Sequence, residues 1–293
     1  MPSCLELIEQ IQKNVGVPWQ SQRPDGYSDG ILIGDPETAV TGIATTCTPS
    51  LDVLRLAAAK GMNVIVCREA PTYSQGERSP AYWREGPAPA KEALDKDPVW
   101  QAKQEFIASH NLTLLRFFDN WDARETDGQL KGLAEALNWD RYHSPLRRAK
   151  TPYVPEDCYF NLPAMSLTNL AASIKKSLRL RAVRVIGNPA APVRKVALAH
   201  GLVLIPQIEK ILREPDIDVI VAGDTVEWEG APYMQDLVTA KMAKGMILIG
   251  NEASEEPGSG EVASWLKTFI HGIPIEWTPA GEPFWTLDGG ARS

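Results

Sequence analysis

The chain has 293 residues, a length that suits one large domain or two lobes with a sizeable buried core. Hydrophobic residues make up 44% and charged residues 23%, as in ordinary soluble globular proteins. The net charge of −7 argues against a general binder of nucleic acid or of anionic membranes.

The N-terminal segment lacks a basic region followed by an apolar stretch, and no segment has the apolar length that spans a bilayer. The sequence therefore predicts a cytoplasmic protein without a membrane partner. Its cysteines are far apart and form no CxxC pair, which gives no support to a zinc knuckle or a disulfide framework. They are Cys4, Cys47, Cys67 and Cys158.

Helical and strand patterns alternate through the first half of the chain. Apolar residues at helical spacing predict helices, and short β-branched runs predict buried strands. The expected helices lie at 5–15, 49–61, 99–109 and 129–137, and the expected strands at 40–46, 63–67 and 112–118.

The second half repeats this strand–helix–strand plan. Helices are predicted at 167–178, 206–213, 233–243 and 264–269, and strands at 183–187, 193–199, 218–222, 246–250 and 273–277. The tetrapeptide Ala-Lys-Gly-Met occurs in both halves, at 59–62 and 243–246. The expected fold class is therefore α/β, a single domain over 1–293 with two similar lobes at about 1–148 and 149–293.

Polar side chains follow three of the predicted strands at the point where each ends. They are Arg68 and Glu69, Asp119 and Asn120, and Asn251 with Glu255 four residues later. Ligands of open α/β sheets collect beyond the carboxyl ends of strands, and carboxylates gathered there suit metal binding or proton transfer. The alternative is that these charges only solubilise turns.

At these residues the chain resembles the Nif-three-like family of dinuclear metal-centre hexameric proteins, also labelled type 2 GTP cyclohydrolase I homologues. Residues 67–71, Cys-Arg-Glu-Ala-Pro, fall where the family has His-His-Pro or, in a close branch, Thr-His-Glu-Pro. Residues 116–121, Arg-Phe-Phe-Asp-Asn-Trp, fall where that branch has Arg-Phe-His-Asp-His-Trp. Residues 250–258 fall where the branch has a histidine with a glutamate four residues on, and the resemblance extends from about Leu5 to Trp285.

The resemblance implies metal ligands at Glu69, Asp119 and Glu255, whereas Arg68 and Asn251 stand where the family has ligand histidines. A guanidinium cannot lose its proton to become a metal ligand, which excludes Arg68 from that role. Arg68 and Asn251 are both expected to bind a small-molecule ligand rather than a metal. The remaining donors are oxygens. We therefore expect a degenerate site without a dinuclear transition-metal centre, holding no metal or one divalent cation, Mg²⁺ or Ca²⁺ rather than Zn²⁺.

These groups are expected to converge in a cleft where the lobes meet, with Arg68 paired to Asp119 or Glu255. Three functions stay open: binding of a small or anionic ligand, metal-assisted hydrolysis of a nucleotide or other small molecule, and ring assembly or partner binding. The sequence names no catalytic residue. A turn histidine such as His200, with no partner evident in the sequence, is more often structural than an acid–base catalyst.

The resemblance also implies a homo-oligomer, most simply a hexamer. Aromatic residues between positions 73 and 100 are expected at its interface. They are Tyr73, Tyr82, Trp83 and Trp100.

Overall fold

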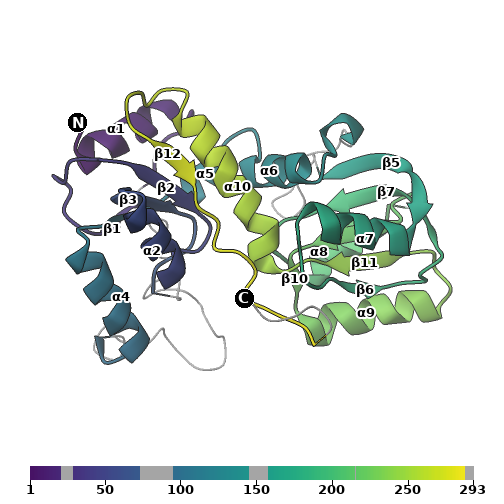
Figure 1. Ribbon diagram of the computed structural model, residues 1–293. Helices are drawn as coiled ribbons and strands as arrows, with labels where there is room; N and C mark the ends of the chain where they lie inside the picture. The colour runs from purple at the N-terminus through teal and green to yellow at the C-terminus, as the bar shows by residue number, and fades with distance from the viewer. Residues whose placement is uncertain (21–28, 73–94, 145–157, 215, 288–293) are drawn as a thin grey trace. The chain divides into compact units, whose positions relative to one another are not determined.

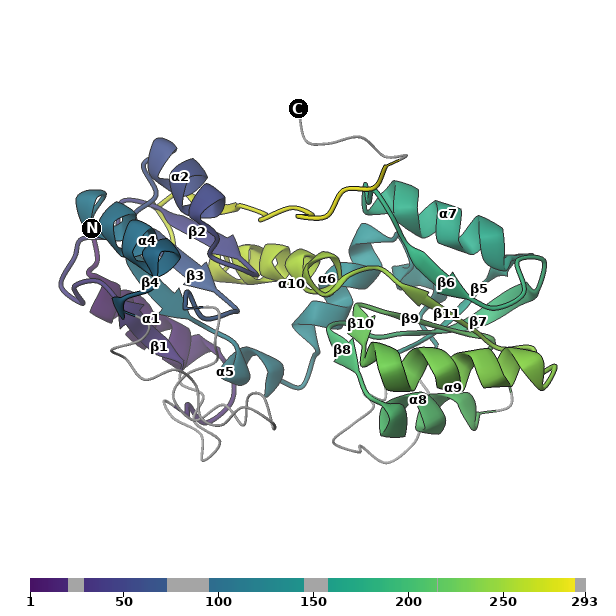
Figure 2. The same ribbon diagram turned by 90° about the horizontal axis from the view of Figure 1, so that it is seen from below.

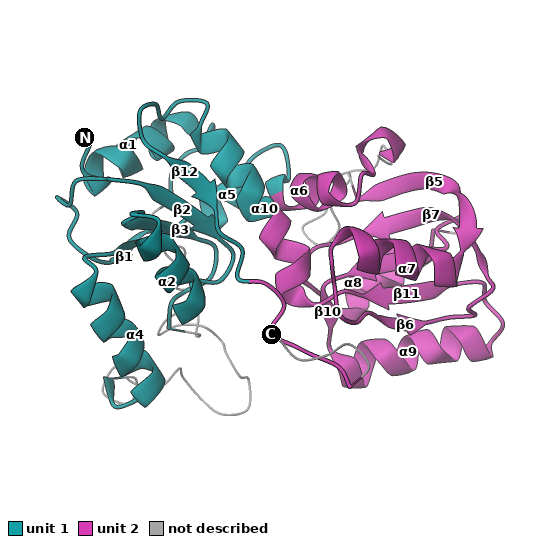
Figure 3. Ribbon diagram, viewed as in Figure 1, with its two compact units in different colours: residues 1–128, 258–280 teal, residues 129–257, 281–293 magenta. Residues whose placement is uncertain are grey.

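The computed structural model describes residues 1–20, 29–72, 95–144, 158–214 and 216–287. It divides into two compact units, shown in Figure 3. Unit 1 comprises Met1–Gly128 and Gly258–Ala280, and unit 2 comprises Gln129–Pro257 and Gly281–Ser293. The return of the chain to unit 1 after residue 257 was not predicted from the sequence.

The described part of unit 1 contains a five-stranded sheet with the order β1-β4-β3-β2-β12 (Figure 1). The four strands from β4 to β12 are parallel, and β1 is an antiparallel edge. The strands are β1 (Gly30–Ile33), β2 (Ile43–Thr46), β3 (Val64–Cys67), β4 (Thr113–Arg116) and β12 (Ile275–Trp277).

Helices cover both faces of this sheet, because successive residues of its central strands point to opposite faces and both sets of side chains are apolar. Ile65 and Leu114 pack with α2 and α4, whereas Val64 and Leu115 pack with α1 and the later turns of α10. The helices are α1 (Cys4–Asn14), α2 (Leu51–Ala59), α4 (Pro98–Ser109), α5 (Asp119–Asp122) and α10 (Asn251–Leu266).

The described part of unit 2 contains a second five-stranded sheet, with the order β5-β7-β9-β11-β6. Its three central strands are parallel and both edges are antiparallel. The strands are β5 (Tyr159–Ser166), β6 (Arg184–Ile186), β7 (Pro192–Leu198), β9 (Val219–Ala222) and β11 (Gly245–Leu248), with a separate short pair of β8 (Leu202–Val203) and β10 (Asp224–Thr225).

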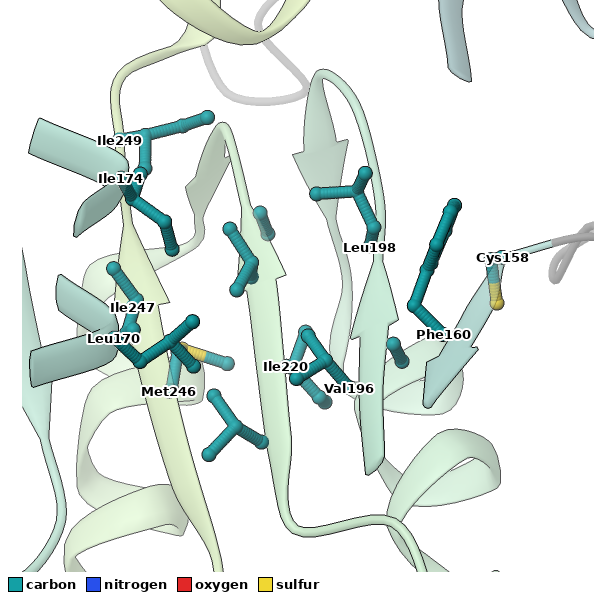
Figure 4. Packing of buried hydrophobic residues seen from close by; sticks show 14 of the residues in the cluster. Cys158, Phe160, Leu170, Ile174, Val196, Leu198, Ile220, Met246, Ile247 and Ile249 are labelled. Atoms are coloured by element: carbon teal, nitrogen blue, oxygen red, sulfur yellow. The ribbon is translucent and has the colours of Figure 1, made fainter. Parts of the chain in front are cut away.

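Figure 2 shows α7 on one face of this sheet and α8 and α9 on the other. Figure 4 shows Leu170 and Ile174 of α7 in the same apolar core as Met246 and Ile247 of β11. The helices of unit 2 are α6 (Gly128–Ala136), the 3₁₀ turn η1 (Asp140–Tyr142), α7 (Leu167–Ser177), α8 (Ile205–Leu212) and α9 (Glu227–Thr239).

These two sheets confirm the predicted α/β fold class, but several elements differ from the sequence prediction. Strands β1 and β5 were not predicted, and α10 begins at Asn251 although a helix was expected only from residue 264. Proline is unfavourable inside a helix, yet Pro257 is accommodated within α10. No helix in the described ranges combines the length and the apolarity needed to cross a bilayer.

The structure also corrects the expected interface aromatics. Trp100 is only 4% exposed and is therefore part of the packed interior of the protein. Tyr73, Tyr82 and Trp83 lie outside the described residues.

Candidate functional site

The register of the unit 1 sheet brings the ends of its central strands level. Thr46 pairs with Cys67, and Cys67 pairs with Arg116. Because these strands are parallel, the residues that follow β3 and β4 emerge at the same edge of the sheet. Arg68 follows β3 at this edge, and Phe118 and Asp119 follow β4 there.

Arg68 forms a bidentate ion pair with Asp122 of α5. Its Nη1 and Nη2 donate to the two carboxylate oxygens at 2.8 and 2.9 Å. Arg68 is 4% exposed, and the Asp122 side chain is 34% exposed. The sequence predicted Asp119 or Glu255 as the partner of Arg68 and gave no signal for Asp122.

Asp119 is bound by a different guanidinium, that of Arg116. Nη1 of Arg116 donates to Asp119 Oδ2 at 2.7 Å and to Asp29 Oδ1 at 2.9 Å. Arg116 is only 3% exposed, and the Asp29 side chain is completely buried. The predicted metal ligand Asp119 is therefore part of a buried ionic network.

The Phe118 ring is shared by both arginines. The guanidinium carbon of Arg68 lies 3.6 Å from the ring centroid, and that of Arg116 lies 4.7 Å from it. Both distances are within the range of cation–π attraction. An aromatic ring thus occupies a position where the resemblance places a histidine, and it stabilises two neighbouring positive charges.

Asn120, at the second such histidine position, uses its amide to bind two segments. Its Nδ2 donates to Gln20 O and Asp29 Oδ2, both at 2.8 Å, while its Oδ1 accepts from Gln20 N at 2.8 Å. Asn120 is 2% exposed. A primary amide can donate to and accept from one peptide group at once, which an imidazole cannot match in this geometry.

Lys103 holds the turn that follows β3 in place by a hydrogen bond. Its Nζ donates to Pro71 O at 2.8 Å, and the residue is 1% exposed. Burial lowers the pKa of Lys103 to about 8 and raises the pKa of the nearby Cys67 thiol to about 12. Cys67 is therefore a packed thiol at neutral pH, while Lys103 gave no signal in the sequence. Glu69 follows Arg68 in this turn and is half-buried, with its N–H bonded to Cys47 O at 2.9 Å.

Unit 2 contains a second group of predicted residues, on the first turns of α10. His200, in the turn between β7 and β8, places its Nδ1 3.1 Å from Oε1 of Glu255. Glu255 is 6% exposed, and the His200 side chain is 18% exposed. The sequence gave no sign of this partner for His200, because the two residues are 55 positions apart.

The His200–Gly201 turn is held against α10 by backbone contacts. The N–H of Gly201 donates to Ser254 Oγ at 2.8 Å, and that hydroxyl donates to Asn251 O at 2.7 Å. Gly201 has φ +64°, and a Cβ there would lie 2.5 Å from Glu255 Oε1 and 3.7 Å from Asn251 Oδ1. Asn251 and Glu255 therefore both face this turn, in agreement with their spacing of four residues on one helix.

The structure thus brings Arg68, Phe118 and Asp119 together in unit 1, and Asn251, His200 and Glu255 together in unit 2. Convergence of the two groups in one cleft stays a prediction. Asp29, Arg116, Asp122 and Lys103 were missed because their roles depend on contacts between distant segments.

Comparisons with known proteins agree with this architecture. Solved structures that cover nearly the whole chain include protein SA1388 of Staphylococcus aureus, at 16% identity and a TM-score of 0.70, covering 98% of this chain and 99% of that one. A Bacillus cereus protein related to NIF3 has 14% identity, a TM-score of 0.67 and the same two coverages. TTHA1606 of Thermus thermophilus has 15% identity and a TM-score of 0.61, covering 97% of this chain and all of that one. At these identities the likeness shows a shared fold.

A comparison with curated protein sequences finds no match. The family model described as Duf34/NIF3 (NGG1p interacting factor 3) matches residues 88–278, about two thirds of the chain. This stretch includes β4 and α5 of the arginine cluster and the whole His200–Glu255 region. The chain belongs to the Duf34/NIF3 family.

Proposed function

We propose that this NIF3-family protein binds a small anionic ligand at the β3 and β4 strand ends of unit 1. The observation that carries the proposal is the bidentate fork of Arg68 on Asp122. Arginine presents a planar pair of donors that matches a carboxylate or a phosphate. The Asp122 carboxylate, a third exposed, occupies the position that such a ligand group would take.

The same residues do not suit the metal centre that the resemblance implies. A divalent cation near Asp119 would lie close to the guanidinium of Arg116, which already binds that carboxylate at 2.7 Å. Arg68, which packs against the same Phe118 ring as Arg116, adds a second permanent positive charge close by. Like charges held at short range in a buried site repel strongly, and neither guanidinium can deprotonate to relieve the repulsion. We therefore propose that this is a degenerate metal site, in which the arginines neutralise the charge of the carboxylates.

An incoming anion must compete with Asp122 for Arg68. Replacing Asp122→Asn removes the competing charge while keeping the size of the side chain. We expect phosphate or acetate to bind this variant at least about tenfold more tightly than the wild type, because a charged hydrogen-bond pair contributes more than about 1.4 kcal/mol. Isothermal titration calorimetry measures the affinity, and a rise in melting temperature on adding phosphate gives an independent readout.

Two variants complete this test. Arg68→Gln should abolish the binding in both backgrounds because the fork itself is gone. Asp52→Asn breaks an exposed ion pair with Arg55 and should leave anion affinity unchanged. Equal affinities of the wild type and of Asp122→Asn would contradict the proposed site.

We also propose that the protein is a homo-oligomer, most simply the hexamer implied by the resemblance. The support in unit 2 is an exposed apolar C-terminal segment in which Phe284 is 72%, Trp285 57% and Leu287 91% exposed. Surface aromatics of this kind are enriched at interfaces. Light scattering at micromolar concentration should report a multiple of the 32.2 kDa chain mass, and the double variant Phe284→Ser, Trp285→Ser should lower it. A monomeric wild type would refute the assembly.

A further inference from the structure

The sheet of unit 2 separates a basic helix from an acidic one. Helix α7 contains two lysines and no acidic residue, whereas α9 contains three acidic residues and no basic one. The surrounding sequence has the same bias, since residues 158–208 include seven lysines and arginines and no acidic residue. Because α7 and α9 cover opposite faces of the sheet (Figure 2), unit 2 presents opposite charges on its two sides.

The basic surface combines the end of α7 with the C-terminal segment. Arg181 holds this segment in place, since its N–H donates to Glu282 Oε2 at 2.7 Å and its Nη1 donates to Phe284 O at 3.2 Å. Exposed aromatic rings therefore lie beside exposed positive charges. We use the name basic surface for Lys175, Lys176, Arg179, Phe284 and Trp285.

The acidic surface is formed around α9 and the β8–β10 pair. Leu202 of β8 lies opposite Asp224 of β10, and α9 begins two residues after β10. Arg184 is paired with Glu227 at 3.3 Å and offsets part of the negative charge at the start of this helix. Large apolar side chains are exposed among the carboxylates, a pattern that marks interaction sites. We use the name acidic surface for Glu229, Asp236, Trp228, Leu202 and Leu204.

We propose that the basic surface of one copy of this chain docks on the acidic surface of a second copy. The inference rests on the homo-oligomer proposed above and names the two surfaces that meet in it. Each surface pairs exposed apolar side chains with one sign of charge, and the opposite signs favour contact between unlike surfaces over contact between like ones. Since the two surfaces differ, the contact is head-to-tail, and head-to-tail contacts form a ring when they close.

Reversal of the charges on either surface tests the pairing. Lys175→Glu with Lys176→Glu, and separately Glu229→Lys with Asp236→Lys, should each raise the concentration at half-assembly at least about a hundredfold, because like charges then face each other. The chain with all four substitutions should assemble again, because its two surfaces have exchanged their charges. Sedimentation velocity of the full chain at micromolar concentration measures the assembly, and thermal unfolding verifies that each variant is folded.

The matched control is Lys13→Glu with Lys267→Glu. It makes the same change in net charge at exposed lysines near the ends of α1 and α10, and it should leave assembly unchanged. Trp228→Ser removes the exposed aromatic ring of the acidic surface and should weaken assembly at least about tenfold.

The outcomes separate this inference from the assembly on which it rests. A monomeric wild type would refute the homo-oligomer itself. An oligomer that persists in both charge-reversed variants would overturn only the pairing of these surfaces and assign them to a different partner. Failure of the four-substitution chain to assemble would likewise overturn the direct contact between them.

Discussion

Replacing Asp29→Asn is expected to lower the free energy of unfolding by about 3–5 kcal/mol, the usual cost of removing one partner of a buried ion pair. Asp29 accepts from Arg116 Nη1 and Phe118 N through Oδ1, and from the backbone and side-chain amides of Asn120 through Oδ2. Its side chain has no exposed surface. An asparagine would turn an N–H₂ group towards these donors and leave part of the Arg116 charge uncompensated.

Urea unfolding followed by tryptophan fluorescence measures this loss. The matched control is Asp52→Asn, which removes the same charge from an exposed pair 3.6 Å long and should cost less than about 1 kcal/mol. A loss from Asp29→Asn as small as that of the control would show that the buried network does not stabilise the strand ends.

The second large effect concerns pH and Lys103. Its pKa is about 8 in the folded protein and 10.5 as an ordinary lysine, because burial disfavours the charged form. Between these values the unfolded chain binds more protons than the folded one, so this lysine makes stability rise with pH. The full gain from about pH 8 to 10.5 is up to about 3 kcal/mol.

Comparison with Lys103→Met isolates this effect. Cys67 acts in the opposite direction, since its folded pKa of about 12 lies above the ordinary 9.0 and its contribution is lost as pH rises above 9. Both proteins retain Cys67, so the difference between their unfolding free energies removes most of its contribution. That difference should shift in favour of the wild type as pH rises from 8 to 10, and parallel pH profiles would contradict the assignment.

The sequence predicted the elements whose signal is local. Val64–Cys67 and Val219–Ala222 are short apolar runs, and both are fully buried central strands. Strand β5 has no such signal, because its exposed and buried residues do not alternate regularly and its register shifts between Asn161 and Met165. Edge strands of this kind depend on the pairing of distant segments, which a local pattern does not encode.

The same distinction holds for the candidate sites. Arg68, Asp119 and Glu255 could be singled out because each follows a predicted strand. Their partners could not, since Asp29 reaches Arg116 across 87 residues and His200 reaches Glu255 across 55. The pairing of Arg68 with Asp122 was missed for the same reason, because α5 had not been predicted as a separate turn that returns a carboxylate to the strand end.

We propose that arginine–carboxylate pairs stand in unit 1 where the resemblance places metal ligands. Elemental analysis of the protein, purified without chelators or a metal-affinity tag, tests it most directly. We expect fewer than two transition-metal ions per chain, because the arginines leave no room for a dinuclear centre. Two such ions per chain in the unmodified protein would contradict it.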